Sequence, residues 1–242
     1  MPHPEAQESL LPTTHTRTTI PHHLLKYWLA RHTLFSRFSS GILLPDALYY
    51  GVTPESIALK ISSHLSSVTS PKKRVLIDAF AGAGGNTIAF ASSGRWDRII
   101  AIEKDDVTLT CAQNNARVYR VEDRVEWVGG DCFDVVRELV GRDASREEAV
   151  VIFGSPPWGG PQYVKQKIFD LEKMEPYSLR ELVEGLGGGD LVLYLPRTTD
   201  LRQIAELVPK EKKVKVVHYC MSGRSKAMCV YLGDFEYGNV EW

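Results

Sequence analysis

Apolar residues recur at different spacings along the chain, and the change of spacing divides it into segments. From Leu24 to Phe38 they follow helical spacing, which predicts an amphipathic helix, in one piece or broken. Thr53 followed by Pro54 is typical of an N-cap with proline in the first turn, so a second helix is expected from there to about Leu65. The Ser/Thr/Pro stretch at residues 66–71 marks a boundary.

Beyond this boundary, short apolar runs alternate with helical patterns. Strict alternation of strand and helix predicts a parallel sheet in a doubly wound α/β fold. The last two strands are joined by a short Ser-Gly turn, which predicts an antiparallel edge hairpin. The expected strands are 74–79, 98–102, 124–128, 149–153, 191–195, 213–219 and 226–232, and the expected helices are 85–92, 107–119, 133–140, 178–185 and 200–208.

Three parts follow from these patterns. Residues 1–22 are rich in Thr, Pro and His and lack apolar periodicity, so we expect a disordered tail there. Residues 23–66 form a small helical N-terminal extension, and residues 67–242 form the doubly wound domain.

The charge and the cysteine content of the chain restrict the classes of partner and site that it can have. The formal net charge is −1, so the chain lacks the basic field of proteins that grip long nucleic acids, and any such partner is held at a small local site. The four cysteines form no C-x-x-C pair, which argues against a metal site, and we expect them to be buried free thiols. Apolar runs stay well short of the ~20 residues of a membrane span.

A glycine-rich turn, Ala81-Gly82-Ala83-Gly84, follows the first strand and opens a helix, where backbone N–H groups can approach a ligand. A nicotinamide dinucleotide fingerprint would place its third glycine at Thr87, so the match is poor. Asp78, which ends the first strand, would repel a pyrophosphate but suits an ammonium group. Glu103, which ends the second, can accept both hydroxyls of a ribose. Together these features fit S-adenosylmethionine.

Asp131 follows the third strand and has two interpretations. It can accept the adenine amine of the cofactor, or it can cap the helix that follows.

A proline-rich loop follows the fourth strand, at the sheet edge where α/β folds place their chemistry. The Ser155 side chain and a carbonyl of this turn can accept hydrogen bonds from an amine, and Trp158 offers a flat stacking surface. The alternative is a loop around a core tryptophan.

This loop resembles the [D/N/S]-P-P-[Y/F/W] motif of amino-directed methyltransferases, and Ser155-Pro-Pro-Trp-Gly-Gly-Pro-Gln-Tyr163 resembles the trimethylguanosine synthase family. Further similar segments occur in the family's order between Leu24 and Phe235, among them Val52-Thr-Pro-Glu55, Asn114-Asn-Ala116 and Leu195-Pro-Arg197.

The resemblance implies a class I, Rossmann-like methyltransferase that converts a 7-methylguanosine cap into the 2,2,7-trimethyl form. Trp158 would stack on the guanine, Ser155 and Pro156 would hold its N2 amine, and Asn115 would contact its edge. Tyr163, Arg197 and Lys226 would bind the cap phosphates, whereas Leu43 stands where a basic phosphate contact is expected. The expected cofactor residues are Thr53, Asp78, Gly82, Gly84, Asn86, Thr87, Glu103, Asp131 and Ser155.

The implied partners are S-adenosylmethionine, 7-methylguanosine-capped small nuclear and nucleolar RNAs, and proteins of their ribonucleoproteins. The implied location is the nucleus, foremost the nucleolus, with the cytoplasm as a further site. Two other functions stay open: an adenine-N6 RNA methyltransferase and a non-catalytic cap-binding module.

Overall fold

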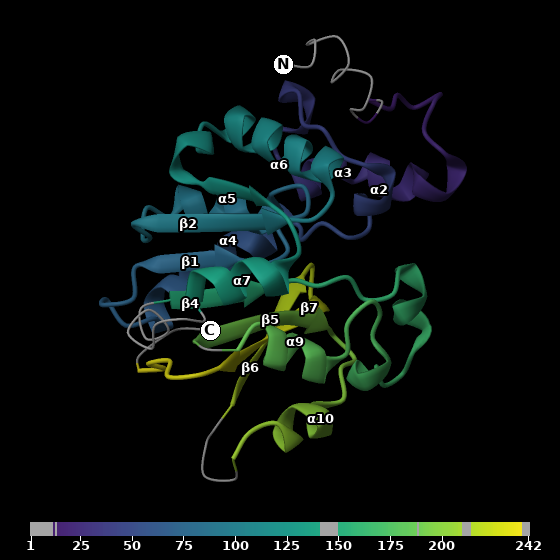
Figure 1. The fold of residues 1–242 in the computed structure, drawn as a ribbon. Helices are drawn as coiled ribbons and strands as arrows, with labels where there is room; N and C mark the ends of the chain where they lie inside the picture. Colours follow the sequence, from purple (N-terminus) through teal and green to yellow (C-terminus); the bar gives the residue numbers. More distant parts are fainter. Residues whose placement is uncertain (1–11, 13, 141–149, 188, 210–213, 239–242) are drawn as a thin grey trace.

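A computed structural model of the chain describes residues 12, 14–140, 150–187, 189–209 and 214–238. Within these ranges, seven strands form one sheet in the order β3-β2-β1-β4-β5-β7-β6 (Figure 1). The first five strands are mutually parallel, and β7 pairs antiparallel with both β5 and β6. The doubly wound sheet with an antiparallel edge is therefore confirmed. The strands are β1 (Val75–Asp78), β2 (Arg98–Glu103), β3 (Glu126–Gly129), β4 (Val150–Gly154), β5 (Asp190–Pro196), β6 (Lys215–Met221) and β7 (Arg224–Leu232).

Helices cover both faces of the sheet, which explains why the central strands are apolar runs without polar alternation. Successive strand residues point to opposite faces. Leu76 accordingly joins one hydrophobic cluster with α4 (Glu55–Val68), α5 (Gly85–Ser92) and α6 (Asp106–Tyr119). Ile77 joins a second cluster with α7 (Cys132–Val140), α9 (Leu179–Gly185) and α10 (Leu201–Glu206).

The N-terminal extension is a chain of short helical pieces rather than one helix. Its aromatic residues Trp28, Phe35 and Phe38 are buried in the same cluster as α4 and α5. The extension therefore shares its hydrophobic core with the sheet domain. Its elements are η1 (His22–Leu24), α2 (Leu25–Leu29), α3 (Arg31–Leu34), η2 (Phe38–Ser40) and η3 (Asp46–Leu48).

In the N-terminal part of the chain, three boundaries differ from the sequence-based expectations. The expected tail ends earlier than residue 22, because Ile20 is buried and the Trp28 indole N–H donates to the His15 carbonyl; residues 1–11 and 13 lie outside the described residues. Helix α4 begins after Pro54, which is its N-cap, so the expected cap at Thr53 is wrong. The same helix continues to Val68, so the expected division after residue 66 falls inside it.

Cys111, Cys132 and Cys229 are buried free thiols as expected, but Cys220 is exposed. It lies on β6, the outermost strand of the sheet, where alternate side chains face solvent.

Candidate active site

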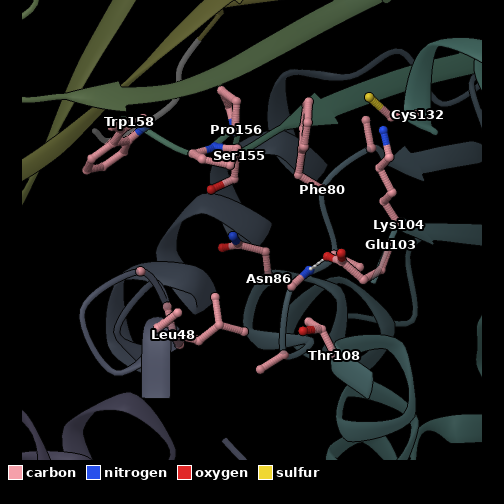
Figure 2. Close-up of a pocket in the computed structure, with 18 of the residues that line it drawn as sticks. Leu48, Phe80, Asn86, Glu103, Lys104, Thr108, Cys132, Ser155, Pro156 and Trp158 are labelled. Carbon is pink, nitrogen blue, oxygen red and sulfur yellow. Dashed lines mark hydrogen bonds between the residues drawn. The ribbon is translucent and has the colours of Figure 1, made fainter. Parts of the chain in front are cut away.

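A pocket of about 470 Å³ opens at the carboxyl ends of β1, β2 and β4 (Figure 2). The turn after β1 and the loop after β4 form two of its walls, and residues 47–53 of the extension form a third. Nine of the expected site residues line it: Thr53, Gly82, Asn86, Glu103, Asp131, Ser155, Pro156, Trp158 and Tyr163.

At one end of the pocket, Glu103 is held by two backbone donors. The Gly82 N–H donates to Oε2 at 2.9 Å, and the Asp105 N–H donates to Oε1 at 2.9 Å. Gly82 has φ +53°, a conformation that favours glycine, and this turn brings its N–H to the carboxylate. Each carboxylate oxygen keeps a free lone pair, so Glu103 can accept two hydroxyl hydrogen bonds.

Asp131, at the same end, does cap a helix. Its Oδ1 accepts from the Phe133 N–H at 3.0 Å, and its Oδ2 lies 3.2 Å from Lys104 Nζ. Partial burial works to raise the Asp131 pKa, but the bonds from Lys104 and Phe133 outweigh it and lower the pKa. Because Asp131 also lines the pocket, the cap does not displace the adenine contact, which stays a prediction.

Asp78 lies behind the pocket wall rather than in it. Its side chain is fully buried, and Thr87 Oγ1 donates to its Oδ2 at 2.6 Å. Burial raises the Asp78 pKa to about 6, against the opposing effect of the Thr87 and Phe80 hydrogen bonds. Asp78, Thr87 and Gly84 do not line the pocket, and the hydrogen bond from Thr87 to Asp78 instead ties the first turn of α5 to the end of β1.

Asn86 and Thr53 form the middle of the pocket, and Figure 2 shows Asn86 projecting into this space. Asn86 Nδ2 donates to Thr53 Oγ1 at 3.1 Å. The other amide atom, Oδ1, is buried and has no hydrogen-bond partner among the described residues. A buried polar atom without a partner carries a free-energy cost, so this position suits a polar ligand group.

Trp158, at the opposite end of the pocket, is not buried in the core, but neighbouring residues hold its side chain in place. Its Nε1 donates to the Tyr194 carbonyl at 3.3 Å, and its ring meets Tyr163 edge-on at 4.9 Å between centroids. Half-buried, it also lines the pocket beside Ser155 and Pro156. The ring is thus fixed by its neighbours while remaining accessible to a planar ligand.

Arg197 and Lys226 belong to the same end of the neighbouring strands β5 and β7. Pro196 of β5 pairs with Ala227 of β7, and Arg197 follows the first while Lys226 precedes the second. Among the described residues, neither has a carboxylate partner within ion-pair distance. Neither residue lines the pocket, but burial raises the pKa of Tyr163 and Arg197 opposes the rise, so Arg197 lies near this pocket residue.

Asn115 corrects one expectation, because it is not at the pocket. Its Nδ2 donates to the Leu43 carbonyl at 2.8 Å and to the Ala83 carbonyl at 3.0 Å. Its Oδ1 accepts from the Leu43 N–H at 2.8 Å and from Asn114 Nδ2 at 3.3 Å. The side chain is fully buried and its hydrogen-bonding capacity is used, so it cannot contact a guanine in this structure.

Other pocket residues were not expected from the sequence, namely Ala47, Leu48, Tyr50 and Gly51 of the extension, and Lys104, Thr108 and Tyr177. These residues carry no motif, and only the tertiary fold brings them to the pocket. The described residues contain no group of three or more potential metal ligands, and none of their helices is long and apolar enough to cross a membrane.

Comparison with known proteins matches residues 73–235 to the family model for RNA cap guanine-N2 methyltransferases. The trimethylguanosine synthase of Schizosaccharomyces pombe is 34% identical over 215 residues, which are 88% of this chain and 87% of that protein. The trimethylguanosine synthase of Saccharomyces cerevisiae is 31% identical over 220 residues, 87% of this chain and 68% of that protein. The structure of the human methyltransferase 10 domain containing protein has the same fold, with a TM-score of 0.59 at 14% identity, covering 90% of this chain and all of that one.

Proposed function

This chain belongs to the family of RNA cap guanine-N2 methyltransferases, and we propose that it converts the 7-methylguanosine cap of small nuclear and nucleolar RNAs into 2,2,7-trimethylguanosine. The observation that carries the proposal is that one pocket joins Glu103 and Asp131 at one end to Ser155 and Trp158 at the other. Methyl transfer requires the donor and the acceptor amine in one cavity, within reach of each other.

S-adenosylmethionine supplies the electrophilic methyl group on its sulfonium. Glu103 would accept the ribose hydroxyls, and Asp131 the adenine amine. The first turn of α5, where Asn86 lies, offers backbone N–H groups and an unpartnered amide oxygen to the amino-acid part. Asp78 would act from behind the wall, by fixing the turn through Thr87.

At the acceptor end, Trp158 would stack on the guanine while Ser155 Oγ and the Pro156 carbonyl accept hydrogen bonds from N2. These bonds favour a pyramidal nitrogen whose lone pair points into the pocket. With the methyl donor bound, Ser155 and Pro156 would thus hold N2 toward its methyl group, and water would take the N2 proton.

Trp158 also explains a preference for a methylated cap. Methylation at N7 gives guanine a positive charge, and a cation over a tryptophan face is worth ~0.5–1 kcal/mol when exposed and ~2 kcal/mol or more when desolvated. An unmethylated cap would keep only the stacking. Tyr163, Arg197 and Lys226 would hold the phosphates at the rim.

The family match favours guanine over adenine and an enzyme over a non-catalytic module. The names of the two yeast relatives support the trimethyl product. With that product we propose a small nuclear or nucleolar RNA substrate, ribonucleoprotein proteins as partners and a nuclear, foremost nucleolar, place of action.

The test is methyl transfer from labelled S-adenosylmethionine to three acceptors: a 7-methylated cap dinucleotide, its unmethylated form, and uncapped adenosine-containing RNA. We expect dimethylation of the first and at least about tenfold lower kcat/KM for the second, since ~1.4 kcal/mol is a factor of ten. Label on the adenosine RNA and none on the cap would overturn the proposal.

A further inference from the structure

A second aromatic group lies at the mouth of the pocket, on the N-terminal extension. Tyr27 of α2 and Tyr50, which follows η3, meet edge-on with ring centroids 6.0 Å apart. Lys26 Nζ lies 4.6 Å from the centroid of the Tyr27 ring. Tyr50 is 37% exposed and lines the pocket, which is unusual for a large ring that could have been buried in the adjoining core.

This aromatic pair borders the acceptor end of the pocket. Tyr50 lines the same pocket as Trp158 and Tyr163, and Tyr27 meets Tyr50 edge-on. The pKa of Tyr163 agrees with this placement, since burial is the main cause of its rise and Tyr27 adds to it. Tyr163 in turn contacts Trp158 edge-on. Figure 1 shows the extension with α2 and α3 on the same side of the sheet as the segment that follows β4. Tyr50, with Tyr27 packed against it, therefore borders the same pocket as Trp158 and Tyr163.

Aromatic rings beside a cation are the usual means of holding single-stranded RNA, because every base has a face that can stack and every nucleotide brings a phosphate. A guanine on Trp158 would leave the pocket through its triphosphate, past Tyr163 and the Arg197–Lys226 pair. The next group along such a chain is the first transcribed nucleotide.

We propose that Tyr27 and Tyr50, with Lys26, form a platform for the base of the first transcribed nucleotide; this inference rests on the proposed cap substrate. The platform makes a capped RNA, rather than the isolated cap nucleotide, the preferred substrate. Stacking is tolerant of base identity, so the preference depends on the presence of a base and not on which base it is.

The experiment compares kcat/KM for 7-methylguanosine triphosphate with kcat/KM for the 7-methylated cap dinucleotide carrying adenosine. Both carry the triphosphate, so their ratio isolates the second nucleoside. We expect wild-type protein to favour the dinucleotide by about tenfold, the order of one stacked base. Tyr50→Ala and Tyr27→Ala should bring the ratio close to one, whereas Tyr50→Phe should keep most of it.

Leu29→Ala is the matched control, since Leu29 is an exposed residue of the same helix α2 outside the pocket, and its ratio should equal that of wild type. Equal use of the two substrates by wild-type protein would overturn the platform while leaving cap methylation intact. A Tyr50→Ala loss that is equal for both substrates would mean that Tyr50 covers the guanine itself, which also overturns it. Failure to methylate either substrate would instead refute the proposed function.

Discussion

The two ends of the pocket are built in different ways. The Glu103 end is local: its hydrogen bonds run between backbone N–H groups and carboxylates of strand ends, all between residues 78 and 133. The Trp158 end is assembled from distant parts of the chain, namely residues 47–53, the loop after β4, and the rim at Arg197 and Lys226. A local end can be recognised from a motif, whereas an assembled end depends on how separate segments meet.

The largest expected effect is a loss of stability on replacing Asn115, whose side chain hydrogen-bonds to Leu43 of the extension and to Ala83 of the glycine turn. We call these hydrogen bonds the Asn115 joint. Asn115→Leu would leave two buried carbonyls and one N–H without partners, at ~1–3 kcal/mol each, so we expect a loss of about 3–5 kcal/mol of stability. Denaturant unfolding measures it, and cofactor affinity should fall as well.

Asn114→Ala is the control for this joint, because it removes one bond to the Gly41 carbonyl and one weak bond to Asn115. Its loss should stay near ~1 kcal/mol. Equal losses in both variants would show that Asn115 is an ordinary buried amide.

The assembled end is tested next, at its central ring. Trp158→Ala removes both the stacking surface and the cation contact, so kcat/KM for the 7-methylated cap should fall by about a hundredfold, equivalent to ~2.7 kcal/mol. The ratio of methylated to unmethylated activity should also fall, and Trp158→Phe should keep part of each. If the melting temperature drops while the ratio is unchanged, Trp158 only supports the fold.

At the local end, the buried Asp78 is expected to make the stability of the protein depend on pH. Since the Asp78 pKa is raised to about 6 from 3.8 when unfolded, the folded state binds more protons between these values, and its stability falls as pH rises from about 4 to 6. Asp78→Asn removes that dependence and should stabilise the protein by about 2–3 kcal/mol at pH 7, at the expense of activity.

Asp97→Asn offers a control of opposite sign. The hydrogen bond from Arg74 lowers the Asp97 pKa, so its contribution to stability is present at neutral pH and is lost on acidification. Stability curves from about pH 2 to pH 8 for wild type and both variants check the two directions, since the Asp97 contribution is lost below about pH 4. A curve for Asp78→Asn parallel to that of wild type would contradict the buried acid.

The smallest effect on activity is expected at the rim of the pocket, at Arg197 and Lys226. Arg197→Ala and Lys226→Ala should each raise KM for a capped substrate about fivefold and weaken its dependence on salt, because each removes one phosphate contact. Arg202→Ala is the matched control, since Arg202 is already paired with Asp200. Unchanged salt dependence in both rim variants would place the phosphates elsewhere.

The contrast between the local Glu103 end and the assembled Trp158 end also explains which features could be predicted from the sequence. The doubly wound sheet with its antiparallel edge follows from the alternation of apolar runs and helical patterns. The Glu103 end follows from carboxylates at strand ends, which parallel strands bring to one edge. Asn115 was expected at the guanine because its motif was recognised but its neighbours were not. Its hydrogen bonds to Leu43 span 72 residues, and no local pattern encodes a contact at that distance. Tyr50 was not expected at the pocket for the same reason.

The Asn115 joint also orders events during synthesis. The extension emerges from the ribosome before α6, yet its backbone at Leu43 finds its partner only when Asn115 has been made. Trp28, Phe35 and Phe38 likewise become buried only when residues of later elements complete their hydrophobic cluster. The extension can thus be fixed in place only after later parts of the chain have been made, because its contacts close a long loop.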